Sequence, residues 1–318
     1  MYTLSAKIEI RGERTWRFGA VTSIEMTRDT EQLTDTCKLT LPKRIKWDGQ
    51  KEIPIRRGDS IRVWTGYDDR LELAYMGYVR EVGIKTPVVI ECEDEMWRLK
   101  QKACRKLAYK SVTLQQLLQD QGLKDVRVFG EQELGQYRVT DDTVAGLLGR
   151  LQRNGIRSFY RLEDGKPVLY CGVLFERDTK KPAQVFATGL NLISYSQLKQ
   201  QKAEDVRLLI KAISIMPNNK RIKVEVGDQD GAHRTLHAYN KKEADLRAWA
   251  EQELRRLKVD GLTGSFTTFG AQLLDKLDNV GIKIDGQRMG IYQVRKNVIK
   301  YSTSGYRQEI TLGQRVRD

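Results

Sequence analysis

Apolar and polar residues alternate in short stretches over the first 95 residues, for example at 4–10, 37–41 and 88–92. Such alternation is typical of strands with one buried face, and Gly, Pro and Asp separate the stretches at the intervals of a small antiparallel barrel or sandwich. Residues 1–95 are therefore predicted to form a first β-barrel domain.

The period changes after Glu95, where apolar residues fall at helical spacing. Thr113 and Gln116 are spaced as a capping box at the start of a helix, and a second helix is predicted to end at Asn154-Gly155. Asp164-Gly165 between two apolar stretches predicts a hairpin. Residues 96–190 are predicted to form an α+β middle domain.

Strand patterns return over residues 191–318 and are interrupted once, by a helical pattern at 241–258 that Asn240 is expected to cap and in which Trp249 lies on the packed face. This part is predicted to be a second β-barrel domain with one inserted helix. The fold class is thus mainly β, with two similar small β-barrel domains flanking an α+β middle domain, which amounts to a weak internal duplication.

The 318 residues include 56 Lys and Arg against 42 Asp and Glu, a formal net charge of +14, and the excess lies in the last two thirds of the chain. A basic surface can meet nucleic acid or an acidic partner. No dense Lys/Arg tract occurs, and the richest run lies in the pattern of the amphipathic helix. A basic nucleic-acid-binding protein is the alternative to the structural role inferred below.

The longest apolar runs are far shorter than the ~20 residues that cross a bilayer, and the first residues lack the plan of a signal peptide, so we expect no membrane span and a cytoplasmic site of synthesis. Four cysteines occur without a Cys-x-x-Cys pair. They are predicted to be reduced and buried.

Residues that could carry catalysis are few. His233 and His237 are the two histidines, and their i, i+4 spacing in a strand pattern suits a surface pair better than a metal site. The carboxylates at 91–95 stand where negative charge favours a helix N-terminus. Nucleotide-binding glycine motifs and a nucleophile elbow are missing. We expect no catalytic, metal or cofactor-binding residue, and a hydrolase with an unrecognised site is a third hypothesis.

Several short motifs carry a family resemblance. They are a Gly-Asp turn before a strand, an aromatic-glycine strand, the late helix, and two Gly-aromatic strands near the end. Their characteristic residues are Gly58, Asp59, Gly77, Tyr78, Trp249, Gly290, Tyr292, Gly305 and Tyr306. In these motifs and in element order the chain resembles the phage tail baseplate hub family, which includes late-control protein D-like proteins and the hub portion of VgrG-type spike proteins.

The resemblance implies a virion structural protein that forms a homotrimer, whose two β domains per subunit build a pseudo-hexameric ring between a six-fold tail tube and a three-fold spike. It implies contacts with a tail spike protein, the tail tube protein and other baseplate proteins, and a channel through which DNA passes without sequence-specific binding. The spike is expected to be another polypeptide. The expected location is the virion tail or baseplate, assembled in the bacterial cytoplasm.

Overall fold

The structure is a computed structural model that describes residues 2–44, 47, 53–130, 132–173, 184–216, 218 and 220–316, with only the backbone of Arg256. Strands dominate this part of the chain, and four α-helices accompany them. The mainly-β class predicted from the sequence is therefore confirmed. None of the helices in the described part is long and apolar enough to span a membrane.

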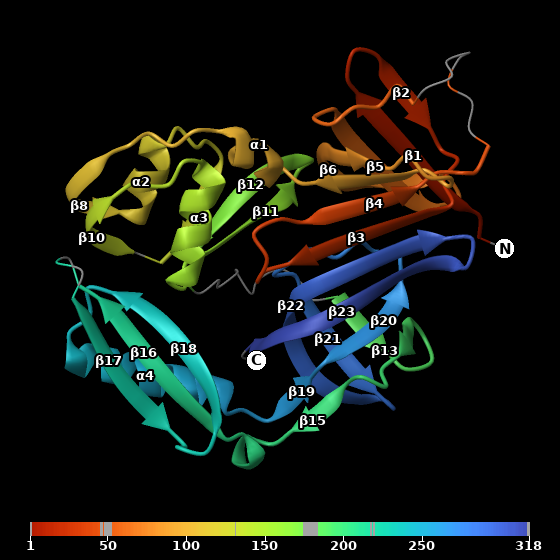
Figure 1. Cartoon of the computed structure of the whole chain (residues 1–318). Coiled ribbons are helices and arrows are strands. Elements are labelled where there is room, and N and C mark those ends of the chain that lie inside the picture. Colours follow the sequence, from red (N-terminus) through yellow and green to blue (C-terminus); the bar gives the residue numbers. More distant parts are fainter. Residues whose placement is uncertain are drawn as a thin grey trace.

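The first β unit lies at the N-terminal end of the chain (Figure 1). Its strands are β1 (Leu4–Arg11), β2 (Thr15–Phe18), β3 (Ser23–Asp29), β4 (Thr36–Thr40), β5 (Ser60–Tyr67), β6 (Arg70–Val82) and β7 (Val89–Glu93). They are hydrogen-bonded in the order β2-β1-β5-β6-β7-β4-β3, all antiparallel. The alternating apolar residues face one core, where Ile8, Leu39 and Val63 are fully buried.

The second β unit lies at the C-terminal end. Its strands are β13 (Gln184–Ala187), β14 (Leu192–Ser194), β15 (Lys199–Gln201), β19 (Gly261–Thr263), β20 (Ser265–Phe269), β21 (Asn279–Ile284), β22 (Gln287–Ser302) and β23 (Gly305–Val316). The order is β13-β21-β22-β23-β20-β14, and β15 pairs separately with β19. Its core is distinct and includes Phe266, Val280 and Val294.

The two units repeat one strand order. The antiparallel path β5-β6-β7-β4-β3 of the first unit corresponds to β21-β22-β23-β20-β14 of the second, and the correspondence also follows the order of the strands along the chain. The sixth strand differs, because β13 runs parallel to β21 whereas β1 runs antiparallel to β5. The internal duplication thus extends to topology.

The two units are joined by strand pairing between β3 of the first unit and β22 of the second. Residues 23–29 of β3 pair antiparallel with residues 296–302 of the long strand β22, so that one sheet continues from one unit into the other. The expected barrels are not closed, because the hydrogen-bonded path of the described strands runs open from β14 to β2. Each unit is a curved sheet, and the pairing of β3 with β22 uses an edge that closure would need.

The middle part of the chain carries α1 (Met96–Gln101), β8 (Ala108–Thr113), α2 (Leu114–Asp120), β9 (Val126–Phe129), β10 (Glu133–Arg138), α3 (Val144–Arg153), β11 (Arg157–Glu163) and β12 (Lys166–Gly172). The Thr113 side chain accepts the Gln116 N–H at the start of α2, as the capping pattern predicts. The turn between β11 and β12 is formed by Asp164 and Gly165, both at positive φ. The domain limits 1–95, 96–190 and 191–318 remain predictions.

A three-stranded sheet is inserted between β15 and β19. It contains β16 (Leu208–Ile215), β17 (Arg221–Gly227) and β18 (Ala232–Tyr239), preceded by a short 3-10 helix (Ala203–Asp205) and followed by α4 (Glu243–Leu257). Leu246 and Ala250 of α4 are buried against the sheet. Asn240 does not cap α4, which begins after Lys242; Asn240 takes a positive φ and donates to Glu133 instead.

Candidate functional site

The loop between β20 and β21, residues 270–278, is the central element of the molecule, and we call it the central loop. Leu273 packs against the core of the first β unit, Leu274 belongs to the core of the second, and Leu277 packs with Phe159 and Tyr170 of the middle part. Three neighbouring side chains therefore tie three separate cores together.

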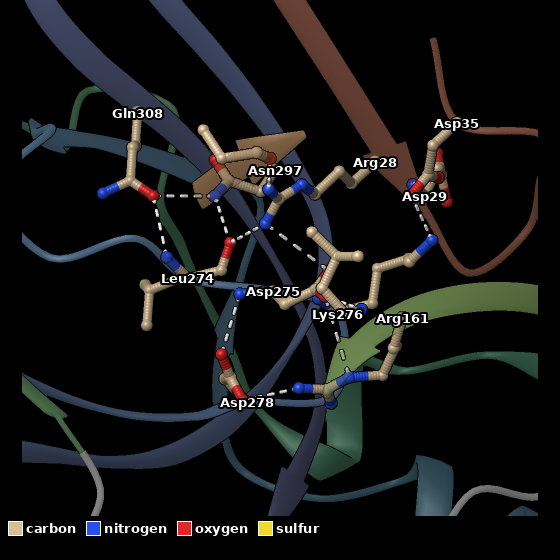
Figure 2. Close-up of polar contacts among 12 residues, drawn as sticks. Arg28, Asp29, Asp35, Arg161, Leu274, Asp275, Lys276, Asp278, Asn297 and Gln308 are labelled. Atoms are coloured by element: carbon tan, nitrogen blue, oxygen red, sulfur yellow. Dashed lines mark hydrogen bonds and ion pairs between the residues drawn. The ribbon is translucent and has the colours of Figure 1, made fainter. Parts of the chain in front are cut away.

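Buried charges surround this loop (Figure 2). Lys276 is fully buried, and its Nζ donates to Asp35 Oδ2 at 2.5 Å. Asp275 lies between two guanidinium groups, 3.7 Å from Arg28 and 3.8 Å from Arg161. Because a buried charge is costly unless it is paired and hydrogen-bonded, these pairs hold the three parts in one arrangement.

Arg161 extends the cluster into the middle part. Its Nη2 donates to Asp278 Oδ1 at 3.1 Å. Arg28 donates to two main-chain carbonyls, that of Leu274 at 3.0 Å and that of Ala74. An arginine can satisfy several acceptors at once with its five donors, so Arg28 connects β6 to the central loop.

A neutral polar layer adjoins the charges (Figure 2). Asn297 Nδ2 donates to the Leu274 carbonyl and to Gln308 Oε1, each at 2.8 Å, and Gln308 Oε1 also accepts the Leu274 N–H at 3.0 Å. Gln308 Nε2 donates to the carbonyls of Phe269 and Gln272. These bonds fix the start of the central loop against β22 and β23.

Three carboxyl groups in and beside this cluster of buried charges have shifted pKa values. Burial raises the pKa of Asp35, and the charge of Lys276 opposes that rise. Burial, with the charge of Asp35, raises the pKa of Asp94 to about 8. Burial alone would raise the pKa of Asp275 too, but Arg28, Arg161 and Lys276 outweigh it and leave that pKa below its ordinary value.

The sequence did not point to this cluster as a site. Its signal is faint: Arg28, Asn297 and Gln308 occupy inward positions of their strands, in alternation with buried apolar residues such as Met26 and Ile310. Polar residues in an inward register predict buried partners. For Lys276, which lies in a loop, the sequence carries no comparable signal.

Two of the predicted signature residues, Gly58 and Tyr78, contact Trp97 of α1, and Gly77 and Asp59 are their chain neighbours. The Tyr78 ring stacks on Trp97 with centroids 5.3 Å apart, and a Cβ at Gly58 would lie 3.2 Å from the same indole. A Cβ at Gly77 would collide with the main-chain oxygen of Glu93. Asp59 shapes the adjoining turn. This group anchors the first β unit to the middle part.

The Asp59 turn occurs twice. The Asp59 N–H donates to the Arg56 carbonyl at 3.2 Å, and Asp59 Oδ2 accepts the Arg56 N–H at 2.8 Å. At the end of the central loop, the Asp278 N–H donates to the Asp275 carbonyl at 3.2 Å, and Asp278 Oδ2 accepts the Asp275 N–H at 2.7 Å. The duplicated units therefore share a turn down to its side-chain bonds.

The residue before each aspartate repeats as well. Gly58 and Leu277 both have positive φ, +94° and +65°. The Gly58 N–H donates to the Val79 carbonyl at 2.8 Å, and the Leu277 N–H donates to the Val294 carbonyl at 2.9 Å. Leucine in this conformation is strained. Its packing in the core of the middle part retains it at that position.

Gly305 and Tyr306 stand at the tip of the β22–β23 hairpin. Gly305 has φ +128°, which suits the tight turn. Tyr306 is fully buried in the core of the first β unit, where its hydroxyl and that of Thr65 are 2.7 Å apart. The Tyr67 hydroxyl donates to the Tyr306 carbonyl at 3.1 Å. A C-terminal side chain thus completes the N-terminal core.

The last three signature residues lie apart from these groups. Tyr292 is buried in the second β unit, where its hydroxyl accepts the Leu262 N–H and donates to the Met289 carbonyl, each at 2.8 Å. Gly290 has φ +118° beside it. Trp249 is only partly buried on α4. Whether any of the nine marks the family remains a prediction.

Trp249 borders a cleft of about 690 Å³ between the middle part, the inserted sheet and the second β unit. Arginines from each part line this cleft, among them Arg157, Arg234 and Arg295. His237 lines it too, and burial lowers the pKa of His237. His233 is exposed on the same strand. No group of three or more potential metal ligands occurs among the described residues.

The remaining candidate groups have structural contacts. Asp94 Oδ1 accepts the Met96 N–H at the start of α1. Glu93 is 2.6 Å from Lys100, and Glu95 is 3.0 Å from Arg98. All four cysteines are free and buried, as predicted.

No family model and no curated protein matches the sequence. Solved structures do match. A tail protein from Neisseria meningitidis MC58 has a TM-score of 0.64 at 15% identity, with 98% of this chain and 96% of that chain covered. The 43 kDa tail protein of prophage MuSo2 from Shewanella oneidensis has a TM-score of 0.62 at 18% identity, with 98% and 97% covered.

A third similar structure is an Escherichia coli component of the type VI secretion system, which is described as structurally similar to the bacteriophage T4 tail proteins gp27 and gp5. Its TM-score is 0.55 at 11% identity, with 98% of this chain and 77% of that chain covered. All three are described as tail proteins or as a component of a secretion system. The chain therefore has the fold of these tail and type VI secretion proteins, in agreement with the fold that its resemblance to the baseplate hub family implies.

Proposed function

We propose that this protein is a structural hub of a phage tail or a related injection machine, in which three copies form a ring that joins the tail tube to the central spike. The observation that carries the proposal is the match of fold over nearly the whole of two tail proteins, one of them from a prophage. A match confined to one unit would leave the role of the rest open.

The repeated β unit supports the trimer. Each chain contributes two units with the same strand order, so three chains supply six similar units. A closed ring of this kind presents approximate six-fold symmetry on a three-fold assembly, which is what an adaptor between a six-fold tube and a three-fold spike requires. Its partners would be the spike protein, the tube protein and other baseplate proteins, with DNA passing through the central channel.

The contacts of the central loop support a role in which the two β units keep fixed relative positions. An adaptor must keep its two units in fixed relative positions while partners pull on them. The ion pairs of Lys276 with Asp35 and of Arg28 with Asp275 join the two units and would be broken if the units moved apart. The proposed location is the virion tail or baseplate, with assembly in the bacterial cytoplasm.

Light scattering tests the proposal directly. The purified protein should have about three times the 36.7 kDa of one chain, and electron micrographs should show a ring with a central hole. A protein that stays monomeric at every concentration up to tens of micromolar would overturn it.

The net charge of +14 favours a second candidate, a nucleic-acid-binding protein. That function predicts binding to random duplex DNA that weakens steeply as salt rises. Undetectable binding at low ionic strength would remove it, and a sequence-independent, salt-sensitive affinity in a monomer would favour it over the hub.

A further inference from the structure

Within the chain, β3 of the first unit pairs with β22 of the second. The equivalent strands, which are β14 and β15 of the second unit and the end of β6 of the first, do not pair with each other in the single chain. We infer that the outer edge of β14 and β15 pairs with the end of β6 from a second copy of this chain, and that this contact closes the ring. The inference rests on the proposed function and names the surfaces that would carry it out.

The repeated turn sets the correspondence between β6 and β22. Val79 and Val294 make the same pair of bonds to the turn, and each is followed by a bulge at an arginine, Arg80 or Arg295. Counting on from the valines, Glu81 corresponds to Lys296. Three residues later, Ile84 corresponds to Ile299.

The correspondence between β3 and β14–β15 follows from their shared neighbours. Ser23 pairs with Thr40 of β4, and Ser194 pairs with Thr267 at the equivalent position of β20. Further along, Thr27 pairs with Thr36 of β4, and Lys199 of β15 pairs with Thr263 at the equivalent position of β19. Asp29 therefore corresponds to Gln201, with one residue more between Ser194 and Lys199 than between Ser23 and Thr27. The edge that β3 offers to β22 is therefore offered a second time by β14 and β15, which are separated by a turn at residues 196 and 197.

The two equivalent isoleucines differ sharply in burial. Ile299 is 0% exposed, because β3 covers it and it joins the core of the first unit. Ile84 is 97% exposed. An isolated exposed isoleucine needs no explanation, but this one stands where its counterpart is fully covered by a neighbouring unit.

Both surfaces are open in the single chain. Beyond Tyr78, β6 has β7 on one side and no described strand on the other. On the other surface, β14 ends the path of described strands, and its Leu192 forms an isolated bridge with Thr188. Apolar side chains are exposed around it, at Leu190, Ile193 and Tyr195. An open strand edge with exposed apolar residues is a template for pairing with another chain.

Register and charge agree with the pairing. Lys296 lies directly opposite Asp29 within the chain, so Glu81 of one copy would lie opposite Gln201 of the next. Lys199 is two residues from Gln201 and lies diagonally across from Glu81, within reach of a cross-strand ion pair. One lysine of the second unit would thus face one glutamate at the end of β6.

Cysteine cross-linking tests the register. The double variant Glu81→Cys with Gln201→Cys should form disulfide-linked dimers and trimers on mild oxidation, and reductant should reverse them. The four native cysteines are buried, so they should not form cross-links in this assay. The matched control is Thr15→Cys with Gln201→Cys, because β2 is the other open end of the sheet. This control should remain monomeric on a non-reducing gel.

The single variant Ile84→Asp gives a second measurement. Because Ile84 is exposed in the single chain, its loss should leave the fold of the monomer unchanged by circular dichroism. Burial of an isoleucine favours association, so self-association should weaken by about tenfold or more.

The outcomes separate the two proposals. A trimer by light scattering that cross-links through Thr15 and Gln201, or through neither pair, overturns the inferred surfaces and leaves the hub function standing. A strictly monomeric wild-type protein overturns the hub function and the inferred contact together. Cross-links at Glu81 and Gln201 alone, with weakened association of Ile84→Asp, support both.

Discussion

Replacement of Lys276 by methionine tests whether the central loop holds the molecule together. The lysine is fully buried and its ammonium group is 2.5 Å from Asp35 Oδ2. Methionine fills nearly the same volume, so the packing is retained while the charge is lost. Asp35 is then left as a buried carboxylate without its closest cation, and the free energy of unfolding should fall by about 3–5 kcal/mol.

A double-mutant cycle separates charge from packing. Asp35→Asn keeps an oxygen that can accept the Asp29 N–H and removes the negative charge. If the cost of Lys276→Met comes from the abandoned carboxylate, the double variant should be more stable than Lys276→Met alone, with a coupling of about 1–3 kcal/mol. The pH dependence should agree, because protonation of Asp35 at low pH should reduce the deficit of Lys276→Met.

Urea unfolding followed by tryptophan fluorescence and by far-ultraviolet circular dichroism measures these differences. Lys300→Met is the matched control, because Lys300 is exposed on β22 and its replacement should change stability by less than about 0.5 kcal/mol. A loss below about 1 kcal/mol for Lys276→Met, or strict additivity in the cycle, would refute the reasoning.

Three further predictions concern single groups. The raised pKa of Asp94, about 8, means that the folded state binds a proton more tightly than the unfolded state, so this group's contribution to stability should fall as pH rises from about 4 to 8. Urea unfolding of Asp94→Asn across that range should show a flatter profile. Tyr306→Phe removes the bond to Thr65 and should cost about 1 kcal/mol, whereas Tyr306→Ala should cost about 3–5 kcal/mol; equal costs would contradict the buried position. Thr113→Ala removes the cap of α2 and should cost about 1 kcal/mol, while Thr113→Ser should restore most of it.

Local signals predicted much of the secondary structure. Alternation marked the strands, and the helix cap at Thr113 and the hairpin at Asp164 were both where their residue types require. The predicted helix cap at Asn240 was wrong. Asparagine also favours positive φ, and Asn240 takes that conformation before α4. Residue type alone does not distinguish the two uses.

These local signals could not predict how the two β units contact each other. The pairing of β3 with β22 brings together residues more than 260 positions apart, and a strand pattern states that an edge exists without naming its partner. The expectation of closed barrels failed for the same reason. Lys276 shows the limit most clearly, since a lysine in a loop is expected to be exposed, whereas this one is fully buried.

The covalent link between the two units has a consequence for how an assembly responds to dilution. Within one chain, β3 and β22 meet at an effective concentration set by the connecting polypeptide, of order millimolar, however few molecules are present. Contacts between chains have no such tether and obey mass action. Lowering the amount of protein should therefore separate whole subunits from one another long before it loosens either half of a subunit.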